Sequence, residues 1–348
     1  MSDRRLGAVV VGLPHHVYYF TGHRPFWLHE AAFVLRSDGR SLLVCANDPP
    51  ADAAADDVRT FEATWNGTQR QDQSWNAGIV AAGHLPAGGT VGVDAAAVSS
   101  QIVLGGGAHF ARVELDLWRL RRRKDVDELA LMRAAIACTR AMYDRARQVI
   151  EPGVPELRVY TELHAAAVDA AGEPLWPAYL GNDFRCAAPG GTPRRGRTAG
   201  AGELYILDLG PAYRGYFSDN CRTFAVDRRP TDAQTKAWRA VTGVFPIVER
   251  LAKPGVRCRD LCAAADDHLR SAGGPGMTHH LGHGVGLQPH EAPHVNPRWD
   301  ETLEEGDVFT CEPGLYGPDL AAGLRIENQY LVTADGVENL TPFPMDLA

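Results

Sequence analysis

Two pairs of carboxylates in this chain are each centred on a predicted hairpin turn. In the first pair, Asp208 ends the strand-like run 203–208, and Asp219 lies in a second apolar run. Their midpoint falls inside the stretch 210–215, whose glycines and proline are typical of a turn. Residues equidistant from the centre of a hairpin face each other, with Cβ atoms roughly 4.5–5.5 Å apart. The sequence therefore predicts that Asp208 and Asp219 oppose each other on neighbouring strands.

The second pair has the same arrangement. Glu312 ends an apolar run, Glu327 lies in another, and their midpoint falls inside the turn-forming stretch 316–323. Opposed like charges are destabilising unless a positive charge lies between them. Because carboxylate oxygens bind divalent cations, we expect the four carboxylates to surround metal ions.

A histidine-rich stretch lies between the two predicted hairpins. Residues 279–294 hold five of the thirteen histidines, among glycines that permit close backbone approach. Neutral imidazole is the commonest nitrogen ligand for transition metals. Four carboxylates and one histidine would neutralise two divalent ions, and two ions roughly 3.5–4 Å apart are a recurrent hydrolytic device. The joint pattern therefore predicts a dinuclear metal centre in a hydrolase.

Taken singly, each of these carboxylates has a plainer interpretation. Asp208 and Asp219 could be ordinary turn residues. Glu312 could end a strand, and Glu327 could face solvent as the partner of Arg325. We favour the metal centre because all four carboxylates occur in order around two hairpins, with the histidines between them.

The length of the chain predicts two domains, since 348 residues are long for a single core. Short β-rich runs broken by Pro, Gly and Asp predict a small α/β domain over residues 1–120. The predicted strands of this domain are 8–12, 17–22, 32–35, 41–45 and 91–93. Residues 121–348 form the second, larger domain.

The second domain is predicted to alternate helices with hairpin sheets. Capping boxes at Asp125 and Thr231 begin two helices, and further helices are expected at 155–172 and 259–271. The order is two helices, a sheet with a hairpin, two helices, and a second sheet with a hairpin. This order is typical of an α+β fold and suggests two similar halves that face each other.

Composition argues against several functional classes. The chain has 35 basic and 43 acidic residues, a net charge of −8, and no long basic block, which argues against a nucleic-acid partner. No run of 18 apolar residues and no charged-then-apolar start occurs, so we expect neither a membrane span nor a secretory signal. The seven scattered cysteines are interpreted as buried thiols of a reducing cytoplasm.

These segments resemble the pita-bread metallopeptidase family, which includes methionine aminopeptidase, aminopeptidase P, prolidase and creatinase. The resemblance covers residues 120–348 well and extends weakly to residues 16–22, which are similar to the start of a creatinase-type N-terminal domain. The matching motifs are 208–223, 282–291, 311–316 and 323–328. The resemblance implies a pita-bread catalytic domain after a small α/β creatinase-like domain, a homodimer, and an Xaa-Pro dipeptidase or aminopeptidase activity on small peptides.

The resemblance also implies roles for individual residues. Two divalent ions, commonly manganese, cobalt or zinc, would be bound by Asp208, Asp219, His283, Glu312 and Glu327, of which Asp219 and Glu327 would bridge both ions. Glu312 would also act as general base or acid, His290 would contact the substrate near the scissile bond, and His279 would line the leaving-group pocket. Arg325 would orient the carboxylates.

One position departs from the Xaa-Pro branch of this family. Members usually carry a histidine shortly before the first metal aspartate, and Gly190 stands where it is expected. Losing such a donor typically lowers the rate by about 10²–10³-fold. Either His280, Arg185 or Asn182 takes over its role, or the substrate is a specialised small amide, for a hydrolase or a lyase that uses the same metals. An inactive binding protein on this fold is a third alternative.

Aromatic residues near the N-terminus also have two interpretations. Tyr18, Tyr19, Phe26 and Trp27 could belong to the core of the first domain, which we favour. They could instead reach the active site of a neighbouring subunit, as the resemblance allows.

Overall fold

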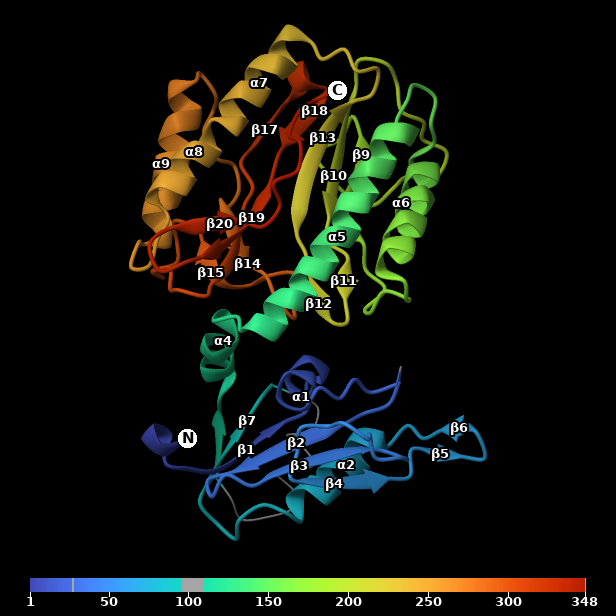
Figure 1. Cartoon of the computed structure of the whole chain (residues 1–348), viewed down its shortest axis with the longest axis vertical. Helices are drawn as coiled ribbons and strands as arrows, with labels where there is room; N and C mark the ends of the chain where they lie inside the picture. The colour runs from blue at the N-terminus through green and yellow to red at the C-terminus, as the bar shows by residue number, and fades with distance from the viewer. Residues whose placement is uncertain (27, 96–108, 348) are drawn as a thin grey trace. The chain divides into compact units, whose positions relative to one another are not determined.

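A computed structural model describes residues 1–26, 28–95 and 109–347. The chain divides into two compact units, residues 1–120 and 121–348 (Figure 1). In the described part of the chain, no helix combines the length and the apolar character that a membrane crossing requires.

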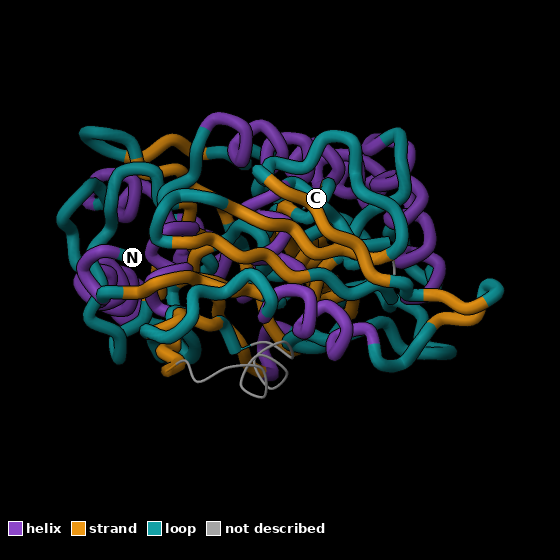
Figure 2. Tube along the Cα trace, turned by 90° about the horizontal axis from the view of Figure 1, so that it is seen from below, coloured by secondary structure: helices purple, strands orange, loops and turns teal. Residues whose placement is uncertain are grey.

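The N-terminal unit is built on a six-stranded mixed sheet with the order β4-β3-β2-β1-β7-β8, and its strands run side by side in Figure 2. The strands are β1 (Leu6–Val11), β2 (Ala32–Arg36), β3 (Ser41–Ala46), β4 (Asp57–Phe61), β7 (Thr90–Val93) and β8 (His109–Arg112); a small hairpin has β5 (Thr64–Trp65) and β6 (Thr68–Gln69). The helices are η1 (Ser2–Arg4), α1 (Pro14–Thr21), α2 (Gln73–Ala82) and α4 (Glu114–Arg122). The structure confirms the strands predicted at 8–12, 32–35, 41–45 and 91–93.

Alternate residues of this sheet face two apolar clusters. On β1, Ala8 and Val10 join the cluster that contains Ala77 of α2. Val9 and Val11 join the opposite cluster, which contains Val17 of α1. This period of two is what a strand buried on both faces requires.

The strand predicted at 17–22 is wrong, because this segment lies in the helix α1. Pro14 occupies the first helical position, where its missing N–H has no partner to lose. Gly22 ends the helix with φ of 68°, and its N–H donates to the carbonyl of Tyr18. Local capping therefore overrides the β propensity of the aromatic run.

The core interpretation of the nearby aromatic residues is wrong for Phe26. Phe26 is 72% exposed and lies in the irregular segment after α1, where no helix or strand directs its side chain inward. Tyr18 and Tyr19 are half-buried. Trp27 lies outside the described residues.

The first half of the larger unit contains α5 (Val126–Val149), α6 (Glu156–Ala171) and a three-stranded sheet with the order β13-β10-β9. Its strands are β9 (Gly181–Cys186), β10 (Leu204–Leu209) and β13 (Asn220–Ala225), with β11 (Ala212–Tyr213) and β12 (Tyr216–Phe217) at the hairpin tip. The capping box predicted at Asp125 is present, and the helix predicted at 155–172 is α6.

The second half contains α7 (Asp232–Thr242), α8 (Val244–Leu251), α9 (Cys258–Ser271) and a five-stranded sheet with the order β15-β14-β16-β19-β20. Its strands are β14 (Gly282–Gly284), β15 (Glu291–Val295), β16 (Val308–Cys311), β19 (Asn328–Val332) and β20 (Val337–Asn339); β17 (Gly314–Gly317) and β18 (Ala322–Arg325) form a hairpin around η2 (Pro318–Leu320). The single helix predicted after Thr231 is two helices, because Pro246 has no N–H to donate to the carbonyl of Thr242.

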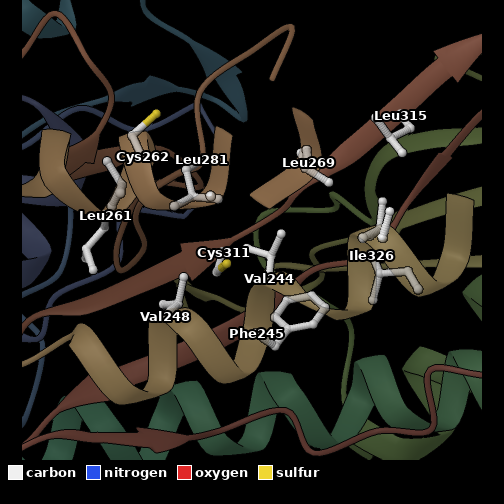
Figure 3. Close-up of a cluster of buried hydrophobic side chains, with 14 of the residues drawn as sticks. Val244, Phe245, Val248, Leu261, Cys262, Leu269, Leu281, Cys311, Leu315 and Ile326 are labelled. Atoms are coloured by element: carbon white, nitrogen blue, oxygen red, sulfur yellow. The ribbon is translucent and has the colours of Figure 1, made fainter. Parts of the chain in front are cut away.

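Figure 1 shows the sheets of both halves between α5 and α6 on one side and α7, α8 and α9 on the other. Apolar residues from α8, α9 and the second sheet meet in one cluster, in which Val244, Phe245 and Val248 of α8 pack near Leu261 and Leu269 of α9 (Figure 3). The core therefore fixes one face of the second sheet, and the other face can carry a site.

Candidate metal centre

The first carboxylate hairpin has a different register from the predicted one. Asp208 pairs with Cys221, so Asp219 is its diagonal neighbour and the prediction that the two aspartates are directly opposed is wrong. The reason is the turn, which is centred on Arg214 and Gly215 with φ of 46° and 88°. These angles belong to a two-residue hairpin turn that lies one residue later than expected. The two carboxylates still interact electrostatically.

The second hairpin has the predicted register. Cys311 pairs with Asn328, and Gly314 pairs with Arg325. Glu312 and Glu327 therefore face each other in the gap between two ladders, as predicted.

Backbone bonds tie the two hairpins and the histidine-rich stretch together at this gap. The N–H of Glu327 donates to the carbonyl of Cys221 in β13, 2.9 Å away. The N–H of Glu312 donates to the carbonyl of Leu281, 2.8 Å away, beside β14. The two glutamates are thus fixed to both other contributors to the site.

His283 lies at the centre of β14 with its ring directed at the carboxylates. Its Nε2 is 3.3 Å from Oε1 of Glu312 and 3.7 Å from Oδ2 of Asp219. Its Nδ1–H donates to the carbonyl of Gly284 at 3.0 Å, which leaves Nε2 as the atom with a free lone pair. Glycine is required beside it, because a Cβ on Gly284 would lie 2.0 Å from the carbonyl oxygen of Ala292.

The five predicted ligands are all buried, and their carboxylates are underpaired. Asp208 Oδ1 and Glu327 Oε2 are buried without any hydrogen-bond partner. Burial, and then the charges of neighbouring carboxylates, raise the pKa of Asp219 and of Glu327 well above their usual range. Buried oxygens without partners, in a set of carboxylates around one imidazole, are a donor set that fits divalent cations.

Glu312 differs from the other carboxylates. Burial raises its pKa, but the interactions with the neighbouring His280 and His283 imidazoles outweigh burial and hold the pKa below its usual range. His280 Nε2 lies 2.8 Å from Glu312 Oε1. Glu312 is therefore ionised and faces two imidazoles.

Three groups of side chains in the described residues place candidate ligand atoms within 4.8 Å of one another. The groups are Asp219 with His283 and Glu327, His279 with His280 and Glu312, and His280 with His283 and His290. Asp208 belongs to none of these groups. Its carboxylate is instead held by Arg325.

Arg325 joins the first hairpin to the second. Its Nη2 donates to Asp208 Oδ2 at 2.7 Å and also to Asp183, and its Nη1 donates to the hydroxyl of Tyr316 at 3.0 Å. Asp183, which pairs with Asp208 across β9 and β10, was not predicted from the sequence. The signal was weak, because the polar run 181–186 does not show the alternation of a strand.

His279 and His290 lie on either side of the central imidazoles. His279 Nδ1–H donates to the carbonyl of His280 at 2.8 Å, and its Nε2 accepts from the Tyr316 hydroxyl at 3.0 Å. Burial lowers the pKa of His279. His290 stacks on His283 with ring centroids 3.6 Å apart, and partial burial and the His283 ring lower its pKa to about 4. Both rings are neutral near pH 7.

A carboxylate occupies the space that a side chain at position 190 would need. A Cβ on Gly190 would lie 2.5 Å from Asp183 Oδ1, and the N–H of Gly191 donates to that oxygen. Of the three residues considered as replacements for the absent histidine, His280 contacts a predicted ligand. Asn182 bonds to Tyr179, and Arg185 donates to the carbonyl of Thr192.

We expect Gly190→Ala to lower the free energy of unfolding by about 1–3 kcal/mol, because the new methyl group overlaps the Asp183 carboxylate. The measurement is urea unfolding of metal-free protein. Gly336→Ala is the matched control, since a Cβ at Gly336 meets no atom within 4 Å. If the two variants have the same midpoint of urea unfolding, Asp183 does not occupy the space beside residue 190.

Comparisons with known proteins extend over nearly the whole chain. A model of metallopeptidase family M24 matches residues 130–334. An uncharacterized peptidase of Staphylococcus aureus (strain USA300) is 29% identical over 352 aligned residues, which cover 99% of this chain and 97% of that protein.

Solved structures share the fold. The prolidase from Pyrococcus furiosus has a TM-score of 0.80 at 24% identity, with 99% of this chain and 98% of that chain covered. The Xaa-Pro dipeptidase from Bacillus anthracis has a TM-score of 0.82 at 22% identity, with coverages of 98% and 94%. These likenesses confirm the α+β pita-bread fold class that the sequence predicted.

Proposed function

We propose, from the premise that the chain belongs to metallopeptidase family M24, that this metallopeptidase-like enzyme hydrolyses the peptide bond of small Xaa-Pro substrates. The proposal includes two divalent ions, manganese, cobalt or zinc, held by Asp208, Asp219, His283, Glu312 and Glu327. The observation that carries it is the convergence of the buried side chains of Asp219, His283 and Glu327, with Glu312 3.3 Å from His283. Asp208 is included because it is buried and interacts electrostatically with Asp219. The substrate class is supported by the shared fold of an enzyme named Xaa-Pro dipeptidase.

When bound, the two ions would polarise the scissile carbonyl and lower the pKa of a water held between the carboxylates. Glu312 would be the proton acceptor, because its pKa is held low and its Oε1 lies 3.3 Å from Nε2 of His283. His290 is partly exposed and stacked against His283, where it can contact the substrate. Arg325 holds Asp208 in a fixed orientation.

We assign His279 to the leaving-group side of the site, where its ring would keep a defined tautomer. Its Nδ1 proton is committed to the carbonyl of His280, and Tyr316 donates to its Nε2. Tyr316 in turn accepts from Arg325, so the ring orientation of His279 is coupled to the charged group that holds Asp208. The tautomer follows from donor and acceptor identity alone, since a carbonyl oxygen cannot donate.

We expect chelation to lower the hydrolysis of an Xaa-Pro dipeptide by about 10³-fold or more, because the ions supply several kcal/mol of transition-state stabilisation. Purified protein is loaded separately with Mn²⁺, Co²⁺ or Zn²⁺ and assayed on Ala-Pro, with Ala-Ala as the matched substrate. Adding metal back to the chelated protein should restore the rate. Hydrolysis that survives complete chelation would rule out the proposed function.

A second candidate function is favoured by Asp183. The Asp183 carboxylate fills the space beside Gly190, where the resemblance expects a histidine side chain, and it is paired with Arg325. A carboxylate has no proton to donate to a leaving group. On this reading the same metal centre serves a specialised small amide, or a lyase reaction. Metal-loaded protein would then cleave neither dipeptide but turn over members of a panel of small amides or sulfonium compounds. Bound metal without any turnover would favour a binding protein instead.

A further inference from the structure

We propose that His280 is a second nitrogen ligand of the ion that His283 and Glu312 hold. The inference rests on the proposed metal centre and adds to it, since neither the paired carboxylates nor the family resemblance gives His280 a place among the ligands. It assigns one half of the centre to two imidazoles and leaves the half around Asp208 to oxygen ligands.

The separations between the donor atoms fit a shared ion. Nε2 of His280 is 2.8 Å from Oε1 of Glu312, and Nε2 of His283 is 3.3 Å from the same oxygen. Ligand atoms that lie about 2.1 Å from one ion and are separated by these distances subtend angles of about 85° and 105° at that ion. Such angles occur in octahedral and tetrahedral coordination. Each imidazole is therefore at a suitable distance to share an ion with Oε1 of Glu312.

The rings of His280 and His283 are also close neighbours. The rings of His280 and His283 are nearly perpendicular, at 83°, with centroids 5.4 Å apart. The candidate ligand atoms of His280, His283 and His290 lie within 4.8 Å of one another.

The main chain holds His280 in this place. The next residue, Leu281, is buried, donates its N–H to the carbonyl of Val295 at 3.0 Å, and accepts from the N–H of Glu312 at 2.8 Å. The carbonyl of His280 itself accepts from Nδ1 of His279. The backbone on the C-terminal side of His280 is therefore tied to the strands that carry the other ligands.

The chemical consequence is a preference among metals. Imidazole suits zinc, cobalt and nickel, whereas carboxylate and water ligands suit manganese and magnesium. Two imidazoles on one ion should therefore give that position a higher affinity for Co²⁺ and Zn²⁺ than for Mn²⁺. The alternative is that His280 remains protonated on Nε2 and only orients Glu312 through a hydrogen bond.

The experiment measures binding of Co²⁺ and Mn²⁺ to metal-free wild type, His280→Gln and His294→Gln. Glutamine keeps a hydrogen-bond donor for Glu312 but lacks the imidazole nitrogen, and His294 is the matched control because it pairs with Glu301 outside the site. We expect His280→Gln to lower the Co²⁺ affinity at least about tenfold, with a smaller loss for Mn²⁺. His294→Gln should bind both ions as wild type does.

Paramagnetic NMR of the Co²⁺-loaded wild type tests the ligand directly and needs no variant. With histidines labelled with ¹⁵N, strongly shifted ring signals from both His280 and His283 are expected, and only His283 should remain shifted in His280→Gln. A shifted signal from His283 alone in the wild type, or equal Co²⁺ affinity in wild type and His280→Gln, overturns the inference and leaves the proposed function standing. Failure of the wild type to bind any ion overturns both.

Discussion

Replacing Asp219 with asparagine is expected to lower the metal-dependent hydrolysis rate by about 10³-fold or more. Asparagine has the same shape, but it has no charge and one carbonyl oxygen in place of two carboxylate oxygens. Asp219 belongs to the first hairpin, interacts electrostatically with Asp208 and with Glu312 of the second hairpin, and has Oδ2 3.7 Å from Nε2 of His283. A residue in that position serves both halves of the proposed centre. The expected 10³-fold lower rate corresponds to a loss of about 4 kcal/mol of transition-state stabilisation.

The same substitution is expected to act in the opposite direction on stability. In metal-free protein, burial and the nearby Asp208 and Glu312 raise the pKa of Asp219 well above its usual range, which means that the folded state disfavours this charge. An uncharged asparagine removes the repulsion, and the backbone N–H at this position keeps its bond to Gln329 Oε1. Asp219→Asn should therefore unfold at a higher urea concentration than wild type in the presence of a chelator.

The matched control is Asp227→Asn, at the end of the same hairpin strand. Asp227 accepts from the backbone N–H groups of Gly202 and Arg229, and asparagine retains an acceptor for such bonds. This variant should keep both the rate and the metal affinity of the wild type. Full activity in Asp219→Asn, or a loss of activity that is matched by Asp227→Asn, would contradict the assigned role.

The site could be predicted from sequence where local pattern and hairpin geometry agree. Glu312 and Glu327 lie the same number of residues from the centre of the turn in the structure. Counting residues from the predicted turn therefore predicted correctly that they face each other. The same counting failed for Asp208 and Asp219, because Arg214 adopts a positive φ and moves the turn by one residue. A non-glycine residue with positive φ is uncommon, and no composition rule identifies it in advance.

The missed parts of the site depend on contacts between distant segments. Asp183 acquires its role from strand pairing with Asp208 and from Arg325, which is 142 residues away along the chain. His280 was singled out only as a substitute for the absent histidine at Gly190, and its distance to Glu312 follows from the pairing around Leu281. Neither relation leaves a periodic signal in the sequence, because side-chain convergence is set by tertiary packing.

The fold was predicted best where capping and periodicity act together. The helix that begins after the capping box at Asp125 was found at the expected place. The prediction for residues 17–22 failed because Pro14 and Gly22 define a helix shorter than three turns, in which the apolar period is too brief to read.

Replacing Arg325 with methionine is expected to lower the free energy of unfolding of the metal-free protein by about 3–5 kcal/mol. Arg325 is buried and donates to Asp183 and to Asp208, so its removal leaves two buried carboxylates without their cation. Methionine has a similar length and fills the space, so the loss reports the charge and not a cavity. Urea unfolding in the presence of a chelator measures this loss of unfolding free energy.

A double-mutant cycle with Asp183→Asn separates this charge effect from other causes. If Arg325 acts by neutralising carboxylates, Asp183→Asn should recover part of the loss in the Arg325→Met background, with a coupling energy of about 1–3 kcal/mol. Bound metal should recover a further part, because an ion beside Asp208 replaces the missing positive charge. A loss that neither Asp183→Asn nor metal reduces would mean that Arg325 supports the fold through its bond to Tyr316, and that Asp208 reaches the metal centre without its help.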